Sequence, residues 1–178
     1  MLITKIIAKN FKTYRELDLD LTVNEEQPII LIGGENGGGK TTLFQAIYSA
    51  LYGLKVKDEQ HFNKLQNAGE RAKSYRNSNN KIELEIHFTG KVLHNDYKYI
   101  IKRLYTLNAQ NNPVEAVMLN LNGDIFNYGT ATPHAERVKK EAEVNKIIKA
   151  NLPQELSKYF LFDAMEAGNL LKDEYLNR

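Results

Sequence analysis

The chain has 178 residues, of which 42% are hydrophobic and 26% charged, and it contains neither cysteine nor tryptophan. A chain of this length can bury the core of one large or two small domains. Without cysteine it offers no thiol nucleophile, disulfide, iron–sulfur cluster or thiolate zinc site, and its four histidines lack metal-ligand spacing. The formal net charge of +2 at pH 7 neither favours nor excludes a nucleic-acid partner.

No segment of the sequence predicts a membrane span or a secretion signal. The longest apolar run, residues 28–32, is far shorter than the roughly 20 residues that a transmembrane helix requires. The N-terminus, MLITKIIAKN, lacks the layout of a signal peptide. We therefore expect a cytoplasmic protein without a membrane partner.

The N-terminal third predicts strands followed by one helix. Apolar residues in 2–7 and their alternation in 17–21 indicate a buried strand and then a half-exposed one. Residues 29–32 form a short continuous apolar run between Pro28 and two glycines, which is typical of a strand covered on both faces. An amphipathic helix of about three turns is expected next, ending at Gly53. Its inward-facing residues are Leu43, Ala46, Ile47, Ala50 and Leu51.

The rest of the chain predicts an irregular excursion, a sheet and helices. Residues 55–80 are polar, with room for a short helix. Residues 81–126 have the alternating and β-branched patterns of an antiparallel meander. Thr132 as the cap and Pro133 as the first helical residue begin a helix that runs to about Leu152, and Pro153 starts another. The expected fold class is α/β, with a helical C-terminal third and a polar end at 172–178 that suggests a fragment.

Residues 34–41, GENGGGKT, match the eight-position pattern of a phosphate-binding loop between a predicted strand and a predicted helix. Glycines let consecutive backbone N–H groups face the β- and γ-phosphates, and the following helix presents its positive dipole end. Lys40 adds a mobile cation, and the Thr41 hydroxyl can ligate Mg²⁺. The pattern predicts nucleotide binding with Mg²⁺. The alternative is a glycine-rich turn that caps a helix without a ligand, which leaves Lys40 unexplained.

The flanks of the loop carry a family resemblance. Asn10-Phe-Lys-Thr-Tyr lies between the first two predicted strands, and the loop and its helix follow up to Gly53. Together these roughly 53 residues resemble the N-terminal ATPase lobe of the Rad50, SMC and RecF group. The resemblance implies a P-loop NTPase fold in which residues 1–178 form the N-terminal lobe of an ABC-type head, within a longer coiled-coil ATPase. It also implies ATP as the ligand, the C-terminal ATPase lobe of the same protein as a partner, head-to-head homodimerisation on ATP binding, and sequence-independent contact with double-stranded DNA.

Site residues follow from the resemblance position by position. The residues that match the phosphate loop are Asn36, Gly37, Gly38, Gly39, Lys40, Thr41 and Thr42. Lys12 matches a basic residue near the nucleotide, and Asp163 falls about where the group has its Q-loop glutamine. Residues 159–166 look most like the Phe-Phe-Asp-Gly-Glu segment of the DndD-like ATPases associated with DNA phosphorothioation. The chain lacks the Leu-Ser-Gly-Gly signature and the late Asp-Glu segment that the group needs for hydrolysis, so we expect it to hydrolyse ATP weakly or not at all by itself.

Asp163 follows four apolar residues and permits three interpretations. In a Walker B strand it would hold Mg²⁺, Glu166 would polarise the attacking water, and the chain would be a self-contained small NTPase. We prefer the Q-loop position, with Asp163 near the metal, because Ala164 stands where a Walker B glutamate would follow. The third is an exposed acid that ends a core strand. A nucleotide-binding regulator that never hydrolyses ATP is a further alternative for the whole chain.

The region from Arg71 to Arg103 has eight basic side chains against three acidic ones. Such an excess predicts contacts with the DNA phosphate backbone, and the alternative is a solvated strand face. The basic residues are Arg71, Lys73, Arg76, Lys81, Lys91, Lys98, Lys102 and Arg103.

Overall fold

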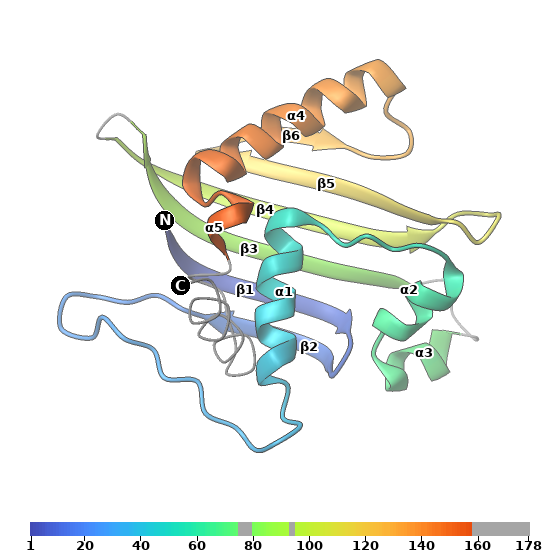
Figure 1. The fold of residues 1–178 in the computed structure, drawn as a ribbon, viewed down its shortest axis with the longest axis horizontal. Helices are drawn as coiled ribbons and strands as arrows, with labels where there is room; N and C mark the ends of the chain where they lie inside the picture. The colour runs from blue at the N-terminus through green and yellow to red at the C-terminus, as the bar shows by residue number, and fades with distance from the viewer. Residues whose placement is uncertain (75–79, 93–94, 158–178) are drawn as a thin grey trace, which may run out of the picture.

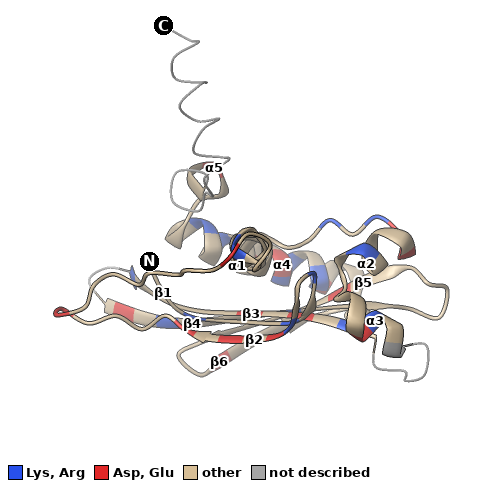
Figure 2. Cartoon of the chain, turned by 90° about the horizontal axis from the view of Figure 1, so that it is seen from below, with Lys and Arg blue, Asp and Glu red and all other residues tan. Residues whose placement is uncertain are grey.

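A six-stranded antiparallel sheet forms the body of the molecule, and α1 and α4 pack on one of its faces (Figures 1 and 2). The computed structural model describes residues 1–74, 80–92 and 95–157. In the order β2-β1-β3-β4-β5-β6, the sheet contains β1 (Leu2–Phe11), β2 (Tyr14–Asp20), β3 (Lys81–Val92), β4 (Asn95–Leu107), β5 (Pro113–Leu121) and β6 (Asp124–Tyr128). The helices are α1 (Lys40–Tyr52), α2 (Glu59–Leu65), α3 (Ala68–Ser74), α4 (His134–Asn151) and α5 (Gln154–Ser157).

The pairing register of the strands places the core on the face beneath α1. Ile6, Ile86, Ile101 and Leu119 stand side by side across β1, β3, β4 and β5, and all four are fully buried. The helix contributes the inward-facing residues that the sequence predicts, which are Leu43, Ala46, Ile47, Ala50 and Leu51. The predicted meander over 81–126 and the α/β fold class are therefore confirmed, and the sheet positions the loop that precedes α1.

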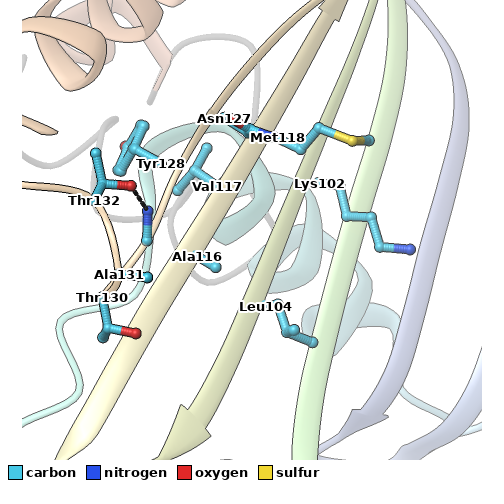
Figure 3. Close-up of a pocket in the computed structure, with 11 residues that line it drawn as sticks. Lys102, Leu104, Ala116, Val117, Met118, Asn127, Tyr128, Thr130, Ala131 and Thr132 are labelled. Carbon is cyan, nitrogen blue, oxygen red and sulfur yellow. Dashed lines mark hydrogen bonds between the residues drawn. The ribbon is translucent and has the colours of Figure 1, made fainter. Parts of the chain in front are cut away.

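The opposite face of the sheet changes from charged to apolar across its width. On β1 and β2, Lys5 pairs with Asp18 at 2.9 Å and Lys9 with Glu16 at 3.1 Å. Towards β5 and β6 the face becomes a shallow hollow of about 480 Å³ beside the segment 129–132 (Figure 3). Its apolar floor includes Leu104, Ala116 and Met118.

The helix boundaries confirm most of the sequence predictions. Gly53 ends α1 with a positive φ of 85°, and its N–H donates to the Ser49 carbonyl at 2.9 Å. The excursion over 55–80 contains the short helices α2 and α3, and α5 follows Pro153 as expected. Thr132 as the cap of α4 is wrong, because its hydroxyl accepts from the Gly129 N–H at 3.0 Å and Pro133 is the N-cap. None of the helices in the described ranges is long and apolar enough to cross a bilayer.

The buried strand predicted for residues 29–32 is wrong. These residues have no strand assignment, and Ile29, Ile30, Leu31 and Ile32 are 84%, 40%, 93% and 42% exposed. A strand needs a neighbour that pairs with its N–H and C=O groups. The sheet of the described residues ends at β2, and residues 22–39 form a long connection that is not part of it (Figure 1). An exposed apolar segment, called here the upstream segment (residues 29–32), therefore precedes the loop.

Candidate functional site

Two glycines of the loop adopt backbone conformations that favour glycine. Gly37 and Gly39 have positive φ angles of 82° and 96°, which residues with a Cβ rarely adopt. Gly38 closes a turn by donating its N–H to the Glu35 carbonyl at 3.0 Å. A Cβ at Gly37 would meet nothing within 4 Å, so this part of the loop faces open space. The loop can therefore bring backbone N–H groups close to a bound anion.

Lys40, the first residue of α1, turns its side chain back over the loop. Its ammonium donates to the carbonyls of Gly34 at 2.5 Å and Glu35 at 2.8 Å. Both acceptors are neutral, so a phosphate oxygen would be a stronger partner for the same cation. The side chain thus holds a positive charge at the mouth of the loop.

The first turn of α1 suits an anion at its N-terminal end. It contains no acidic residue, so its unpaired N–H groups and positive dipole end are not neutralised from within the helix. Thr41 is exposed there, whereas Thr42 is only 8% exposed and belongs to the buried side of the helix. The Thr41 hydroxyl is therefore the more accessible of the two for a metal ion. These residues fit a polyphosphate with Mg²⁺.

Lys12 lies in the turn between β1 and β2 and reaches α1. Its ammonium donates to Gln45 Oε1 at 2.5 Å and lies 5.7 Å from the centre of the Phe11 ring. Burial lowers the pKa of Lys12 below its ordinary 10.5, because the charged ammonium loses part of its hydration. Tyr14, the first residue of β2, contacts the loop itself, because its hydroxyl donates to the Gly39 carbonyl at 2.8 Å. The turn thus brings Lys12 to the second turn of α1 and Tyr14 to the loop.

Comparison with known proteins assigns this arrangement to a family. A family model described as an AAA domain matches residues 5–176. The chain belongs to this family of AAA domains. One solved structure, from work on ATP-driven dimerization and DNA stimulated activation of SMC ATPases, matches with a TM-score of 0.37 and 16% identity, covering 97% of this chain and 99% of that one. A likeness of this strength does not assign a function. No curated protein matches.

The acidic part of the predicted site lies outside the described residues of this AAA domain. Asp163 belongs to 158–178, as do Glu166 and the apolar residues 159–162. Within the part of the chain that the structure describes, no group of three His, Asp or Glu side chains could hold a metal ion. The role of Asp163 therefore stays a prediction.

The composition of the region from Arg71 to Arg103 predicts one exposed basic surface, but its described side chains do not form one. The Arg103 side chain is only 4% exposed and donates to Glu115 Oε1 at 2.8 Å, so it is a core residue and cannot contact DNA. Lys102 pairs with Glu83 at 2.8 Å and Glu85 at 3.3 Å. Arg71 donates to the Asn63 carbonyl, and Lys91 and Lys98 are exposed. The side chains of Lys73 and Arg76 lie outside the described part.

Sequence reasoning missed the residues that support the loop. Tyr14 and Lys12 belong to the Asn-Phe-Lys-Thr-Tyr segment that carries the family resemblance, but only Lys12 received a role. Gln45, which accepts from Lys12, sits on the helix as an unremarkable polar residue. No spacing in the sequence predicts that a tyrosine will contact the glycine loop, because the contact forms only when β1 and β2 pair and bring the turn to α1.

Proposed function

We propose that this AAA domain is the ATP-binding lobe of an SMC/Rad50-like ATPase that acts in DNA repair, modification or defence. The observation that supports it is the phosphate loop, in which two glycines with positive φ precede a lysine whose ammonium already lies over the loop carbonyls. Lys40 and the loop N–H groups would bind the phosphates, and the Thr41 hydroxyl, with Asp163 as a predicted second ligand, would hold Mg²⁺. The bound metal would supply charge neutralisation on the phosphates.

The upstream segment favours a partner lobe over a self-contained NTPase. Its apolar side chains are exposed directly before the loop. Beside it lies an open cavity of about 600 Å³, to which Leu21, Ile30, Leu152 and Leu156 contribute. An exposed apolar patch of this kind marks an interaction surface. We propose that the C-terminal ATPase lobe of the same protein covers it, in a cytoplasmic coiled-coil protein that dimerises head to head when ATP binds and contacts double-stranded DNA without sequence preference.

Isothermal titration with ATP and Mg²⁺ tests the binding role. Lys40→Ala should weaken ATP binding roughly ten- to hundredfold, because it removes charge-assisted hydrogen bonds to phosphate. Lys139→Ala is the matched control, since Lys139 is exposed on α4 and the change removes the same charge far from the loop. If both variants bind like the parent, the proposed role of Lys40 is wrong. If the parent does not bind, the loop is a helix-capping turn.

Hydrolysis separates the two-lobe proposal from the self-contained enzyme. The chain alone should turn over ATP close to background, and addition of the C-terminal lobe should raise the rate. Turnover near 1 s⁻¹, about the low end for enzymes, by the isolated chain, abolished in Asp163→Ala, would instead favour Walker B chemistry at Asp163. Leu31→Asp should block the stimulation by the added lobe without changing ATP affinity.

A further inference from the structure

The turn between β1 and β2 has a conformation that must be held from outside. Asn10 and Lys12 have positive φ angles of 55° and 49°. Left-handed backbone is unfavourable for residues other than glycine, and Lys12 gains nothing from the local side-chain hydrogen bonds that help asparagine. Neighbouring groups therefore have to stabilise this turn.

Asn67, between α2 and α3, supplies most of that stabilisation. Its side-chain amide donates to the carbonyls of Lys12 at 3.0 Å and Thr13 at 3.2 Å. Its backbone N–H donates to Asn10 Oδ1 at 3.1 Å. The Lys12 N–H donates to the carbonyl of Leu65, at the end of α2, at 2.8 Å. The junction of α2 and α3 thus holds the turn through four hydrogen bonds.

The turn between β1 and β2 also holds the phosphate loop. The Tyr14 hydroxyl and the Leu43 N–H both donate to the Gly39 carbonyl, at 2.8 and 2.9 Å. A Cβ built on Gly39 would lie 3.0 Å from both Thr13 Oγ1 and the Tyr14 hydroxyl, so the turn packs directly against this glycine. The Gly39 carbonyl belongs to the peptide that precedes Lys40. The hydrogen bond from Tyr14 therefore fixes the last peptide of the loop.

We propose that Tyr14 and Asn67 are positioning residues of the phosphate loop: Asn67 fixes the turn, and Tyr14 transmits that order to the peptide between Gly39 and Lys40. For nucleotide affinity this rests on the proposed function, whereas the ordering of the loop does not. Burial raises the pKa of Tyr14 above its ordinary 10.0, so its hydroxyl stays protonated and can donate throughout the neutral range. By linkage, a ligand that orders the loop also orders the turn and the start of α3.

Tyr14→Phe removes only the hydroxyl and is the first test. Amide hydrogen exchange in residues 39–43 of the full chain without nucleotide should become roughly three- to tenfold faster, as expected for one lost hydrogen bond. ATP should bind more weakly by a similar factor. Tyr48→Phe is the matched control, because Tyr48 is on α1 and accepts from Gln154 at 2.7 Å, away from the loop. It should alter neither quantity.

Asn67→Asp separates the turn from the cap of α3. Asn67 Oδ1 accepts from the N–H groups of Gly69 at 3.1 Å and Glu70 at 3.3 Å, and aspartate caps a helix as well as asparagine does. The variant loses the donors to Lys12 and Thr13. Exchange at residues 12–14 and 39–43 should therefore rise several-fold while α3 keeps its protection, whereas Asn67→Ala should also loosen α3.

The outcomes distinguish this inference from the proposed function. If the parent shows no ATP binding that depends on Lys40, the proposed function fails and exchange at 39–43 alone decides the positioning roles. Unchanged exchange in Tyr14→Phe, or an equal rise in Tyr48→Phe, would overturn them. In a parent that binds ATP, faster exchange with unaltered affinity would also overturn them, since Tyr14 would then be a structural contact only. Faster exchange together with weaker binding, absent from Tyr48→Phe, supports them.

Discussion

The phosphate loop joins two apolar stretches whose surroundings differ completely. In α1, which follows the loop, Leu51 is fully buried against the sheet, whereas Leu31 in the upstream segment is 93% exposed. The sequence patterns of both stretches predict burial, but a pattern can only state that a residue suits an apolar environment. Burial also requires a surface to pack on, and within the described residues α1 packs on the sheet, whereas the upstream segment only borders an open cavity. The site is therefore fixed on its helix side and open on its upstream side.

The helix side is fixed at its far end by a buried arginine. Arg103 donates to the carbonyls of Ala50 and Leu51, each at 2.8 Å, and these carbonyls lack partners within the helix because α1 ends there. Its third contact is Glu115, which also accepts from the Tyr105 hydroxyl at 2.6 Å. Arg103 therefore ties the C-terminal end of α1 to β4 and β5, while the turn at Tyr14 ties the N-terminal end.

The largest expected effect comes from breaking this tie. Arg103→Met should lower the free energy of unfolding by about 3–5 kcal/mol, because it removes the counterion of Glu115 and leaves two helix carbonyls without a donor. Urea unfolding measures the change. Lys98→Met, on the same strand but exposed, should stay within about 0.5 kcal/mol of the parent. A loss below about 1 kcal/mol in Arg103→Met would mean that the far end of α1 does not need this arginine.

A matched pair of leucines tests the contrast between the two stretches directly. Leu51→Ala should destabilise the isolated chain by about 2–5 kcal/mol through lost burial and a cavity. Leu31→Ala, the same chemical change, should alter stability by no more than about 0.5 kcal/mol, because the Leu31 side chain is 93% exposed. Thermal or urea unfolding of both variants gives the comparison. Equal losses would show that the upstream segment is buried in the chain in solution, which would break the contrast.

The sequence predicted those parts of the fold that depend on local patterns. The alternation in the meander, the inward face of α1 and the stop at Gly53 each follow from the side chains of one element, and the structure confirms them. The upstream segment was mispredicted because its state depends on a neighbour that the pattern does not specify. The prediction for Arg103 is wrong for the same reason. A basic residue type does not indicate that the folded chain will bring two helix carbonyls and a carboxylate to its side chain.

The candidate site also contains residues that local spacing predicts and residues that only the fold brings together. The loop residues could be predicted because phosphate binding imposes a spacing on glycine, lysine and threonine within one segment. Tyr14 and Asn67 could not, because their contacts join residues 25 and 55 positions apart in the chain. Such contacts depend on the pairing of β1 with β2 and on the path of the excursion after α1, and neither follows from residue types alone.

A smaller effect on stability is expected on the charged face of the sheet, where the carboxylates pair with basic side chains of the same chain. Burial alone would raise the pKa of Glu85, but its hydrogen bond with His87 and the charge of Lys102 outweigh this, and the pKa lies below its ordinary 4.5. A carboxyl group with a depressed pKa stabilises the fold at pH values above its pKa in the unfolded chain. This stabilisation is lost as the pH falls through its pKa in the folded chain. Glu85→Gln should therefore flatten the loss of stability between about pH 5 and 3, by less than about 1 kcal/mol for this partly solvated group. Urea unfolding across this range checks it, and parallel curves for parent and variant would contradict it.

The smallest expected effect concerns DNA binding, and it compares exposed lysines with a lysine that is already ion-paired. Lys91 and Lys98 are exposed, whereas the Lys102 ammonium is already held by Glu83 and Glu85. If the lobe contacts DNA through about three phosphates, log K should fall with log salt with a slope near −2.7. Replacing Lys91 and Lys98 together by alanine should reduce that slope by about two, because each exposed lysine that meets a phosphate releases its own counterion. Lys102→Ala should change the slope much less, since its charge is compensated before DNA arrives. Binding of the parent and variants to a random duplex at several salt concentrations gives the slopes. A slope that responds to Lys102 but not to the exposed pair would place the DNA contact at the cluster of Lys102, Glu83 and Glu85 and overturn this prediction.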